Sequence, residues 1–244
     1  MRLSYTKLSL FDFCPWAYRL RYVEKVRPPY HPRLLAGAIV HNIISDFLVR
    51  VRDNLSTGLD DLNAIFEFRW RSAGALDRDE TVDRRAEALA LTSEFWKANQ
   101  ADFGRPLKLE ERFRLEVDGD RVEGIVDRVE DLGSGEVAVI DYKSGAAPDG
   151  NPAEGSLQLS IYALACKEYW GLNPTRVSLY YLNGNSLRTA DVDTPRLEAT
   201  KHTIRTTAAR INAADFPPNP DSRCNDCDYL RRCDHGQAWI RENQ

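Results

Sequence analysis

Three consecutive segments between residues 108 and 145 constrain the fold of this chain more than any other feature. Apolar side chains alternate with polar ones, or form short runs, in KLEERFRLEV, DRVEGIVDRVED and EVAVIDYKSG, as expected for β-strands. The sequences DGD and LGSG, which are strong turn formers, separate the segments. The pattern therefore predicts three strands in an antiparallel meander.

Helical patterns precede this meander. Apolar residues recur at helical spacing over residues 6–23, where Pro15 is expected to break the helix. After the proline-rich loop RPPYHP, the segment LLAGAIVHNIISDFLVRV predicts a long apolar helix. Residues 59–103 are more polar, and their apolar side chains at spacings near 3.6 predict helices that cover a core.

A further helix is expected directly after the meander. Asn151, Pro152 and Glu154 are arranged as an N-cap, a first helical residue and a capping-box partner. They predict a helix that runs through LQLSIYALACKEYW and ends at Gly171.

A hairpin that turns at Asn183 and Gly184 and a last helix over residues 195–214 complete the chain. Helices, strands, one helix, a hairpin and a final helix indicate an α/β or α+β fold with a single central sheet. We expect one domain over residues 1–244, with a helical insertion at 42–107. No internal repeat and no low-complexity segment interrupts it.

Composition narrows the class of protein. A chain of 244 residues that is 43% hydrophobic can fill one sizeable core. No apolar run approaches the roughly 20 residues that a membrane span needs, so a soluble cytoplasmic protein without a membrane partner is expected. The formal net charge of -4 argues against nucleic-acid binding through bulk positive charge. Local basic clusters that could touch phosphate are Arg19 with Arg21, Arg50 with Arg52, residues 201–210, and Arg231 with Arg232.

The strand EVAVIDYKSG carries the residues of greatest chemical interest. Side chains two apart on a strand share a face, so Asp141 and Lys143 project together while Tyr142 points the other way. If the preceding strand pairs through the LGSG turn, the carboxylate of Asp127 approaches that of Asp141. Two close carboxylates repel each other unless a cation lies between them.

Mg²⁺ and Mn²⁺ are the cations that suit such a carboxylate pair. They take oxygen ligands, polarise a phosphodiester and lower the pKa of a bound water. Lys143 could then position that water or stabilise charge on the phosphate. The alternative is an exposed Asp-Lys ion pair of little consequence, which is common for D-x-K alone.

Gln158 and Tyr162 lie four residues apart on the helix after D-Y-K, so they form one stripe that can face the same site. Taken alone, both read as structural residues. His41 lies in an otherwise apolar helix, where a lone histidine is more often a hydrogen-bonded core residue than a ligand. It becomes a candidate ligand if that helix packs across the sheet near Asp127.

The cysteines form a second constellation. Cys224, Cys227 and Cys233 are spaced C-x2-C-x5-C in a polar segment, where thiols have little reason to pack. Four thiolates complete either a zinc site or an iron-sulfur cluster. Cys166 lies in an apolar helix and is expected to behave as a small hydrophobe. Cys14 is therefore the expected fourth ligand, and residues 1–30 and 215–244 are expected to form a clasp.

These parts together resemble the RecB-like branch of the PD-(D/E)XK nuclease superfamily, and its iron-sulfur members in particular. The resemblance covers most of the chain and follows the family's order. The matching parts are LSLFDFCPWAYRLRY, GAIVH, GIVD, DYK, QLSIY and the terminal C-x2-C-x5-C. It implies a restriction-endonuclease-like α/β core, with a central mixed sheet flanked by helices and an iron-sulfur clasp that joins the two terminal segments.

The resemblance also implies roles for single residues. It implies that Mg²⁺ or Mn²⁺ is held by His41, Asp127, Asp141 and the backbone carbonyl of Tyr142, and that Lys143 is the catalytic lysine beside Asp127 and Asp141. Gln158 and Tyr162 match the motif that supports the active site and contacts DNA. The [4Fe-4S] cluster would be bound by Cys14, Cys224, Cys227 and Cys233. Glu111, ahead of the first strand, is a candidate helper carboxylate.

The implied activity is metal-dependent hydrolysis of DNA, as an exonuclease on single strands or overhangs. Within the branch, the chain resembles nucleases that work beside the CRISPR integrase during spacer acquisition, and DNA repair with a helicase partner is the other pathway. No G-x4-GK[ST] phosphate loop occurs, which argues against intrinsic helicase activity. The competing hypothesis is a non-catalytic module, stabilised by zinc or a cluster, that binds DNA ends or a partner protein.

Overall fold

The structure is a computed structural model that describes residues 1–29, 32–73 and 79–243, with the backbone alone for residues 32–34 and 79–82. The loop expected at RPPYHP lies partly outside the described residues. In chain order the elements are β1 (Arg2–Leu3), α1 (Tyr5–Phe13), α2 (Pro15–Tyr18), the π-helix η1 (Arg19–Val23), α3 (Pro32–Arg52), α4 (Leu59–Ser72), α5 (Asp79–Asn99), β2 (Pro106–Val117), β3 (Asp120–Gly133), β4 (Glu136–Ala146), α6 (Leu157–Glu168), β5 (Asn173–Asn183), β6 (Ser186–Asp191), α7 (Thr194–Asn212), the short 3-10 helices η2 (Ser222–Asp226) and η3 (Leu230–Arg232), and α8 (Asp234–Asn243).

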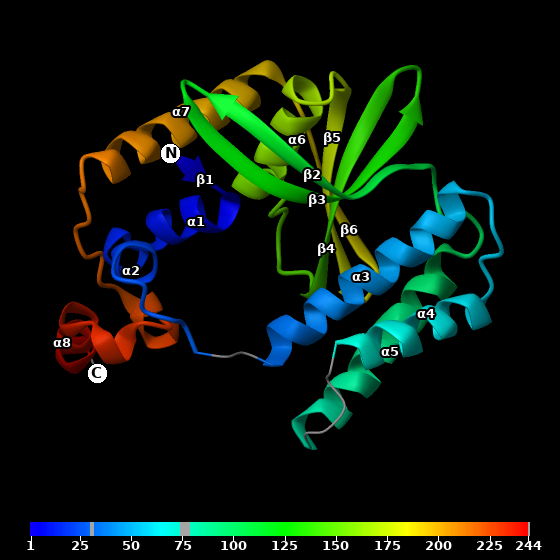
Figure 1. The fold of residues 1–244 in the computed structure, drawn as a ribbon, viewed down its shortest axis with the longest axis horizontal. Coiled ribbons are helices and arrows are strands. Elements are labelled where there is room, and N and C mark those ends of the chain that lie inside the picture. Colours follow the sequence, from blue (N-terminus) through cyan, green and yellow to red (C-terminus); the bar gives the residue numbers. More distant parts are fainter. Residues whose placement is uncertain (30–31, 74–78, 244) are drawn as a thin grey trace. The chain divides into compact units, whose positions relative to one another are not determined.

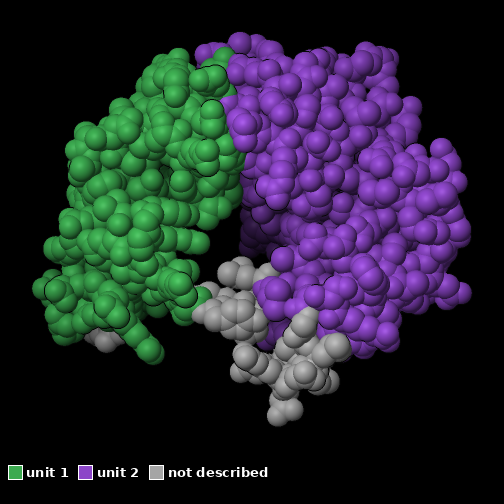
Figure 2. Space-filling view, in the orientation of Figure 1, with its two compact units in different colours: residues 1–30, 116–123, 201–244 green, residues 31–115, 124–200 purple. Residues whose placement is uncertain are grey.

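The chain divides into two compact units, which Figure 2 shows in different colours. Unit 1 comprises residues 1–30, 116–123 and 201–244, and unit 2 comprises residues 31–115 and 124–200. The expected organisation, one nuclease domain with a terminal clasp and a helical insertion, stays a prediction.

The strands form a mixed six-stranded sheet with the order β1-β3-β4-β5-β6, and β2 pairs with β3 (Figure 1). Pairing is antiparallel between β3 and β4, parallel between β4 and β5, and antiparallel between β5 and β6. The parallel step requires a crossover, which α6 provides. The expected mixed sheet, the three strands and the hairpin at Asn183 and Gly184 are confirmed.

Alternation along β4 places different helices on the two faces of the sheet in unit 2. The Tyr142 side chain belongs to a core formed with α3, α4 and α5, whereas α6 packs against β4 and β5. Figure 1 shows α3, α4 and α5 side by side. Within the described part of the chain, no helix is long and apolar enough to cross a membrane.

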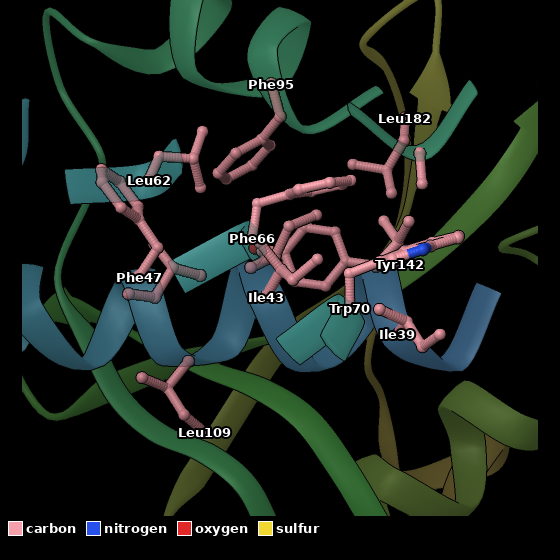
Figure 3. Packing of buried hydrophobic residues seen from close by; sticks show 14 residues of the cluster. Ile39, Ile43, Phe47, Leu62, Phe66, Trp70, Phe95, Leu109, Tyr142 and Leu182 are labelled. Carbon is pink, nitrogen blue, oxygen red and sulfur yellow. The ribbon is translucent and has the colours of Figure 1, made fainter. Parts of the chain in front are cut away.

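Large aromatic side chains fill the core beneath α3, α4 and α5 (Figure 3). Phe47, Phe66, Trp70 and Phe95 are each at most 2% exposed, and the rings of Phe95 and Tyr142 meet edge to face with centroids 5.9 Å apart. Such rings bury about 150–250 Å² each, so this contact fixes the helices firmly against β4.

The start of α6 differs from the expectation. The helix begins at Leu157, and its N-cap is Ser156, whose hydroxyl accepts a hydrogen bond from the N–H of Leu159. Asn151 caps a separate turn instead, because its side-chain oxygen accepts from the N–H of Ala153 and its amide donates to Glu154. The predicted N-cap at Asn151 is therefore wrong: a self-contained turn uses the same residue pattern.

Candidate active site

The end of β4 carries a buried ion pair. Asp141 is 1% exposed, and its Oδ2 atom lies 2.7 Å from Nζ of Lys143, on the strand face opposite Tyr142. Burial costs a carboxylate its hydration, so a partner cation is needed to keep it charged. The predicted shared face of Asp141 and Lys143 is confirmed.

Gln158 of α6 joins both members of that pair. Lys143 Nζ donates to Gln158 Oε1 over 2.9 Å, and Gln158 Nε2 donates to Asp141 Oδ1 over 2.7 Å. The same amide nitrogen lies 2.9 Å from the hydroxyl of Tyr162. The stripe expected on this helix therefore reaches the D-Y-K strand and fixes the orientation of the Asp141 carboxylate.

Asp127 of β3 approaches β4 from the neighbouring strand. Its Oδ2 atom accepts a hydrogen bond of 3.0 Å from the N–H of Tyr142, and it lies 3.1 Å from Nδ1 of His41 on α3. Gly124, three residues earlier, allows β3 to pass close to β2, because a Cβ there would lie 2.6 Å from the ring of Phe113. The condition that makes His41 a candidate ligand is thus met.

The structure adds Glu110, which the sequence reasoning missed. Ligand atoms of His41, Glu110 and Asp127 lie within 4.8 Å of one another. Glu111, the carboxylate expected to help, is exposed and is not in this cluster.

A break in β2 explains why Glu110 rather than Glu111 faces the site. Glu110 has a φ of 46°, in the left-handed region that few residues other than glycine adopt. Leu109 packs into the core below α3, whereas Phe113 contacts the ring of Tyr162 on α6, so the strand changes face between them. A regular strand would place these two residues on one face. Such backbone strain is common at functional sites.

Burial and nearby charges shift the pKa values of Glu110, Asp141 and His41. Burial and then the charge of Asp127 raise the pKa of Glu110 to about 7. The pKa of Asp141 is raised by burial and by Asp127, while Lys143 opposes the shift. Burial lowers the pKa of His41, but the hydrogen bond to Asp127 and the three nearby carboxylates outweigh it and raise that pKa. The site holds more negative charge than its own cations neutralise.

These side chains fit a hard divalent cation. Within the described residues, Asp141 Oδ2 accepts no hydrogen bond of acceptable geometry, although the ammonium of Lys143 is close to it. A buried carboxylate oxygen with a free lone pair is what Mg²⁺ and Mn²⁺ bind, but Asp141 is not among the three residues whose ligand atoms lie within 4.8 Å of one another. An open pocket of about 410 Å³ is lined by His41, Glu110, Asp127 and Lys143, among others, so solvent and a substrate can enter.

We expect the affinity for Mn²⁺ to weaken as the pH falls through about 7. A bound cation must displace the proton that Glu110 carries below its pKa, so affinity drops by about tenfold per pH unit for each displaced proton and levels off above that pKa. Calorimetric titrations from about pH 5.5 to 8.5 measure this slope. Glu110→Gln should bind more weakly at high pH and lose part of the slope, whereas Glu111→Gln should match the parent. An unchanged slope in Glu110→Gln contradicts the assignment.

The four cysteines expected to bind a cluster lie together in unit 1. One shared pocket is lined by Cys14, Cys224, Cys227 and Cys233. Cys166 is fully buried in α6 of unit 2, in agreement with its expected role as a small hydrophobe. Burial raises the pKa of Cys227, and the charges of the other three cysteines raise it further, so four thiolates here require a cation.

Two unpaired donors line the same pocket. Trp16 Nε1 and the hydroxyl of Tyr229 are buried without a hydrogen-bond partner in the described part of the chain. Native structures rarely leave such groups unsatisfied, so an acceptor such as cluster sulfur suits this pocket. Among the described residues, no three of the thiols lie within 4.8 Å of one another. Thiolates around one zinc ion, with Zn–S bonds of about 2.3 Å, lie about 3.8 Å apart. The thiols are therefore spaced more widely in this structure than they would be around a single zinc ion.

Three of the four predicted basic clusters contain arginines that form ion pairs with carboxylates. The arginine ion pairs are Arg19 with Glu24, Arg50 with Asp61, Arg52 with Asp53, Arg205 with Asp118, and Arg210 with Asp215. These pairs reduce the attraction of the clusters for phosphate.

Comparisons with known proteins identify the family of the chain. The sequence profile of the PD-(D/E)XK nuclease superfamily matches residues 2–234. The Gene 69 proteins of Mycobacterium phages L5 and D29 are 23% and 24% identical to this chain, each over 94% of it and 95% of their own length. A crystal structure from Eubacterium rectale, provisionally described as an exonuclease, has a TM-score of 0.57 and 10% identity over 97% of this chain and 87% of its own, which shows a shared fold. Because the profile match spans nearly the whole sequence, this chain belongs to the PD-(D/E)XK nuclease superfamily.

Proposed function

We propose that the chain is a divalent-metal-dependent DNA nuclease whose catalytic residues are Asp127, Asp141 and Lys143. The observation that carries the proposal is that two side-chain networks lie next to each other on the adjacent strands β3 and β4. One is the Asp141, Lys143 and Gln158 network, and the other is the carboxylate and histidine cluster around Asp127. A structural ion pair would not need a second acidic cluster beside it.

The residues divide the work as follows. His41, Asp127, Asp141 and the carbonyl of Tyr142 would hold Mg²⁺ or Mn²⁺, and Glu110 is a further ligand candidate. When bound, such an ion polarises the phosphodiester and lowers the pKa of a bound water. Lys143 orients the attacking water and stabilises negative charge on the phosphate. Gln158 would hold Lys143 and Asp141 in position through its hydrogen bonds to both, and Tyr162 would support Gln158. A DNA contact by Gln158 or Tyr162 rests on the motif resemblance alone.

Finer parts of the proposal rest on the motif resemblance. We propose exonucleolytic cleavage of single strands or overhangs, which agrees with the provisional description of the Eubacterium rectale protein. The pathway would be CRISPR spacer acquisition beside an integrase, or DNA repair beside a helicase. A [4Fe-4S] cluster bound by Cys14, Cys224, Cys227 and Cys233 would stabilise unit 1, supported by the pocket that these thiols share.

A cleavage assay with metal control tests the proposed activity. Single-stranded, overhang and blunt DNA, labelled at either end, is incubated with Mg²⁺ or Mn²⁺ and then with excess chelator. We expect progressive shortening from an end of single-stranded and overhang substrates, complete loss of cleavage with chelator, and retained DNA binding. Binding without cleavage under every metal condition would favour the non-catalytic module.

A further inference from the structure

Two cations contact the ring of one tyrosine in unit 1, and two more lie close enough to act on one of them. Nζ of Lys7 lies 5.4 Å, and the guanidinium carbon of Arg21 5.3 Å, from the centroid of the Tyr22 ring. The charges of Arg2 and Lys25 also act on Lys7. We refer to Arg2, Lys7, Arg21, Tyr22 and Lys25 as the Tyr22 patch.

The positive charge of the Tyr22 patch is largely uncompensated. Among the described residues, no carboxylate forms an ion pair with Arg2, Arg21 or Lys25, in contrast to the paired arginines described above. Burial lowers the pKa of Lys7, and the charge of Lys25 lowers it further, against an opposing effect of Glu123. Like charges held this close repel each other, and an anion would relieve that repulsion.

Lys25 occupies a backbone position that does not favour lysine. It follows the π-helix η1 with a φ of 61°, where glycine or asparagine is the usual residue, and the N–H of Val26 closes back on the carbonyl of Leu20. The side chain is exposed, so packing does not explain the choice. Lysine at this turn adds an exposed charge that acts on Lys7.

We propose that the Tyr22 patch binds phosphates of the DNA strand on which the nuclease acts. This proposal rests on the proposed function, because it takes DNA as the ligand. A chain with a net charge of -4 needs a local positive surface to hold a polyanion. The ring of Tyr22 holds Lys7 and Arg21 by cation–π contact, which preorganises both donors for phosphate oxygens.

Salt-dependent binding tests the Tyr22 patch. Binding of a fluorescent single-stranded oligonucleotide is measured by anisotropy from about 50 to 200 mM salt, in chelator, with the full chain carrying Arg21→Gln and Lys25→Asn. Asparagine tolerates the left-handed conformation, so the fold is preserved. We expect the variant to bind roughly tenfold more weakly than the parent at low salt. In a plot of log affinity against log salt, its slope should be smaller by about 1.4, because each of the two lost phosphate contacts contributes about 0.7.

The matched control removes the same charge elsewhere. Lys167→Gln with Arg176→Gln takes two exposed cations from unit 2 and should change the slope little. If log affinity falls with log salt at the same slope for the parent and the patch variant, the proposal is overturned. If the parent binds and cuts DNA while the patch variant matches it, the patch alone fails. If the parent binds no DNA, the proposed function fails too.

Discussion

We expect Lys143→Ala to slow DNA cleavage by roughly 100-fold to 1000-fold, which is typical for the loss of one preorganised charge-stabilising group. Lys143 contacts both Asp141 and Gln158, so its ammonium is held in place before any substrate arrives. Preorganisation is what makes one such donor effective in a site partly shielded from water. Single-turnover rates on end-labelled DNA, with saturating Mn²⁺, measure the effect on the chemical step.

Two comparisons separate catalysis from folding. Lys143→Ala removes a positive charge beside the carboxylates, so Mn²⁺ should bind at least as tightly as in the parent, whereas Asp127→Asn should lose both affinity and cleavage. Lys167→Ala, on an exposed position of α6, should leave the rate unchanged. Parent-like cleavage by Lys143→Ala would refute its catalytic role. Lost cleavage together with a large fall in the unfolding temperature would point to structure instead.

Much of this site could be predicted because strand periodicity fixes side-chain faces. D-Y-K specified that Asp141 and Lys143 share a face and that Tyr142 points to the other one, and the structure shows that this other face is the core. A helix after the strand, with Gln158 and Tyr162 one turn apart, was also sufficient to predict a stripe that can reach the site.

Glu110 shows where periodicity fails. Its position depends on a left-handed residue inside β2, and nothing in KLEERFRLEV requires one. Regular alternation cannot tell which of two adjacent glutamates faces inward once a strand has an irregularity. Burial of Leu109 and Phe113 against different helices decides between them, and that packing is a property of the tertiary fold.

The start of α6 shows a different limit. Asn151, Pro152 and Glu154 satisfy a helix-capping pattern, yet their hydrogen bonds close a turn five residues before the helix begins. Local hydrogen bonds of this kind compete with helix initiation, and the sequence pattern is the same for both outcomes.

The choice of His41 as a ligand candidate depended on tertiary packing. Only the approach of α3 to Asp127 distinguishes His41 from a core histidine.

We expect Cys14→Ser to remove the proposed cluster and to destabilise unit 1 strongly. The buried core beside the thiols is small: Ala17, Leu20 and Tyr229, with partly buried neighbours that include three of the cysteines. Metal–thiolate sites in small domains contribute on the order of 10 kcal/mol to folding, which a core of this size cannot replace. Protein purified without oxygen should be brown for the parent and colourless for the variant.

The fifth cysteine provides the control. Cys166→Ala changes a fully buried thiol in α6, so it should cost about 1 kcal/mol and leave the visible absorption intact. Limited proteolysis should cut residues 215–243 readily in Cys14→Ser but not in Cys166→Ala, because only the former loses the thiolate that would join the N-terminal segment to the C-terminal one in the proposed clasp. A colourless parent that contains one zinc ion would reject the iron-sulfur assignment and keep the clasp. Equal protease resistance of Cys14→Ser and the parent would reject the clasp itself, since the remaining three cysteines all lie in the C-terminal segment and cannot join it to the N-terminus.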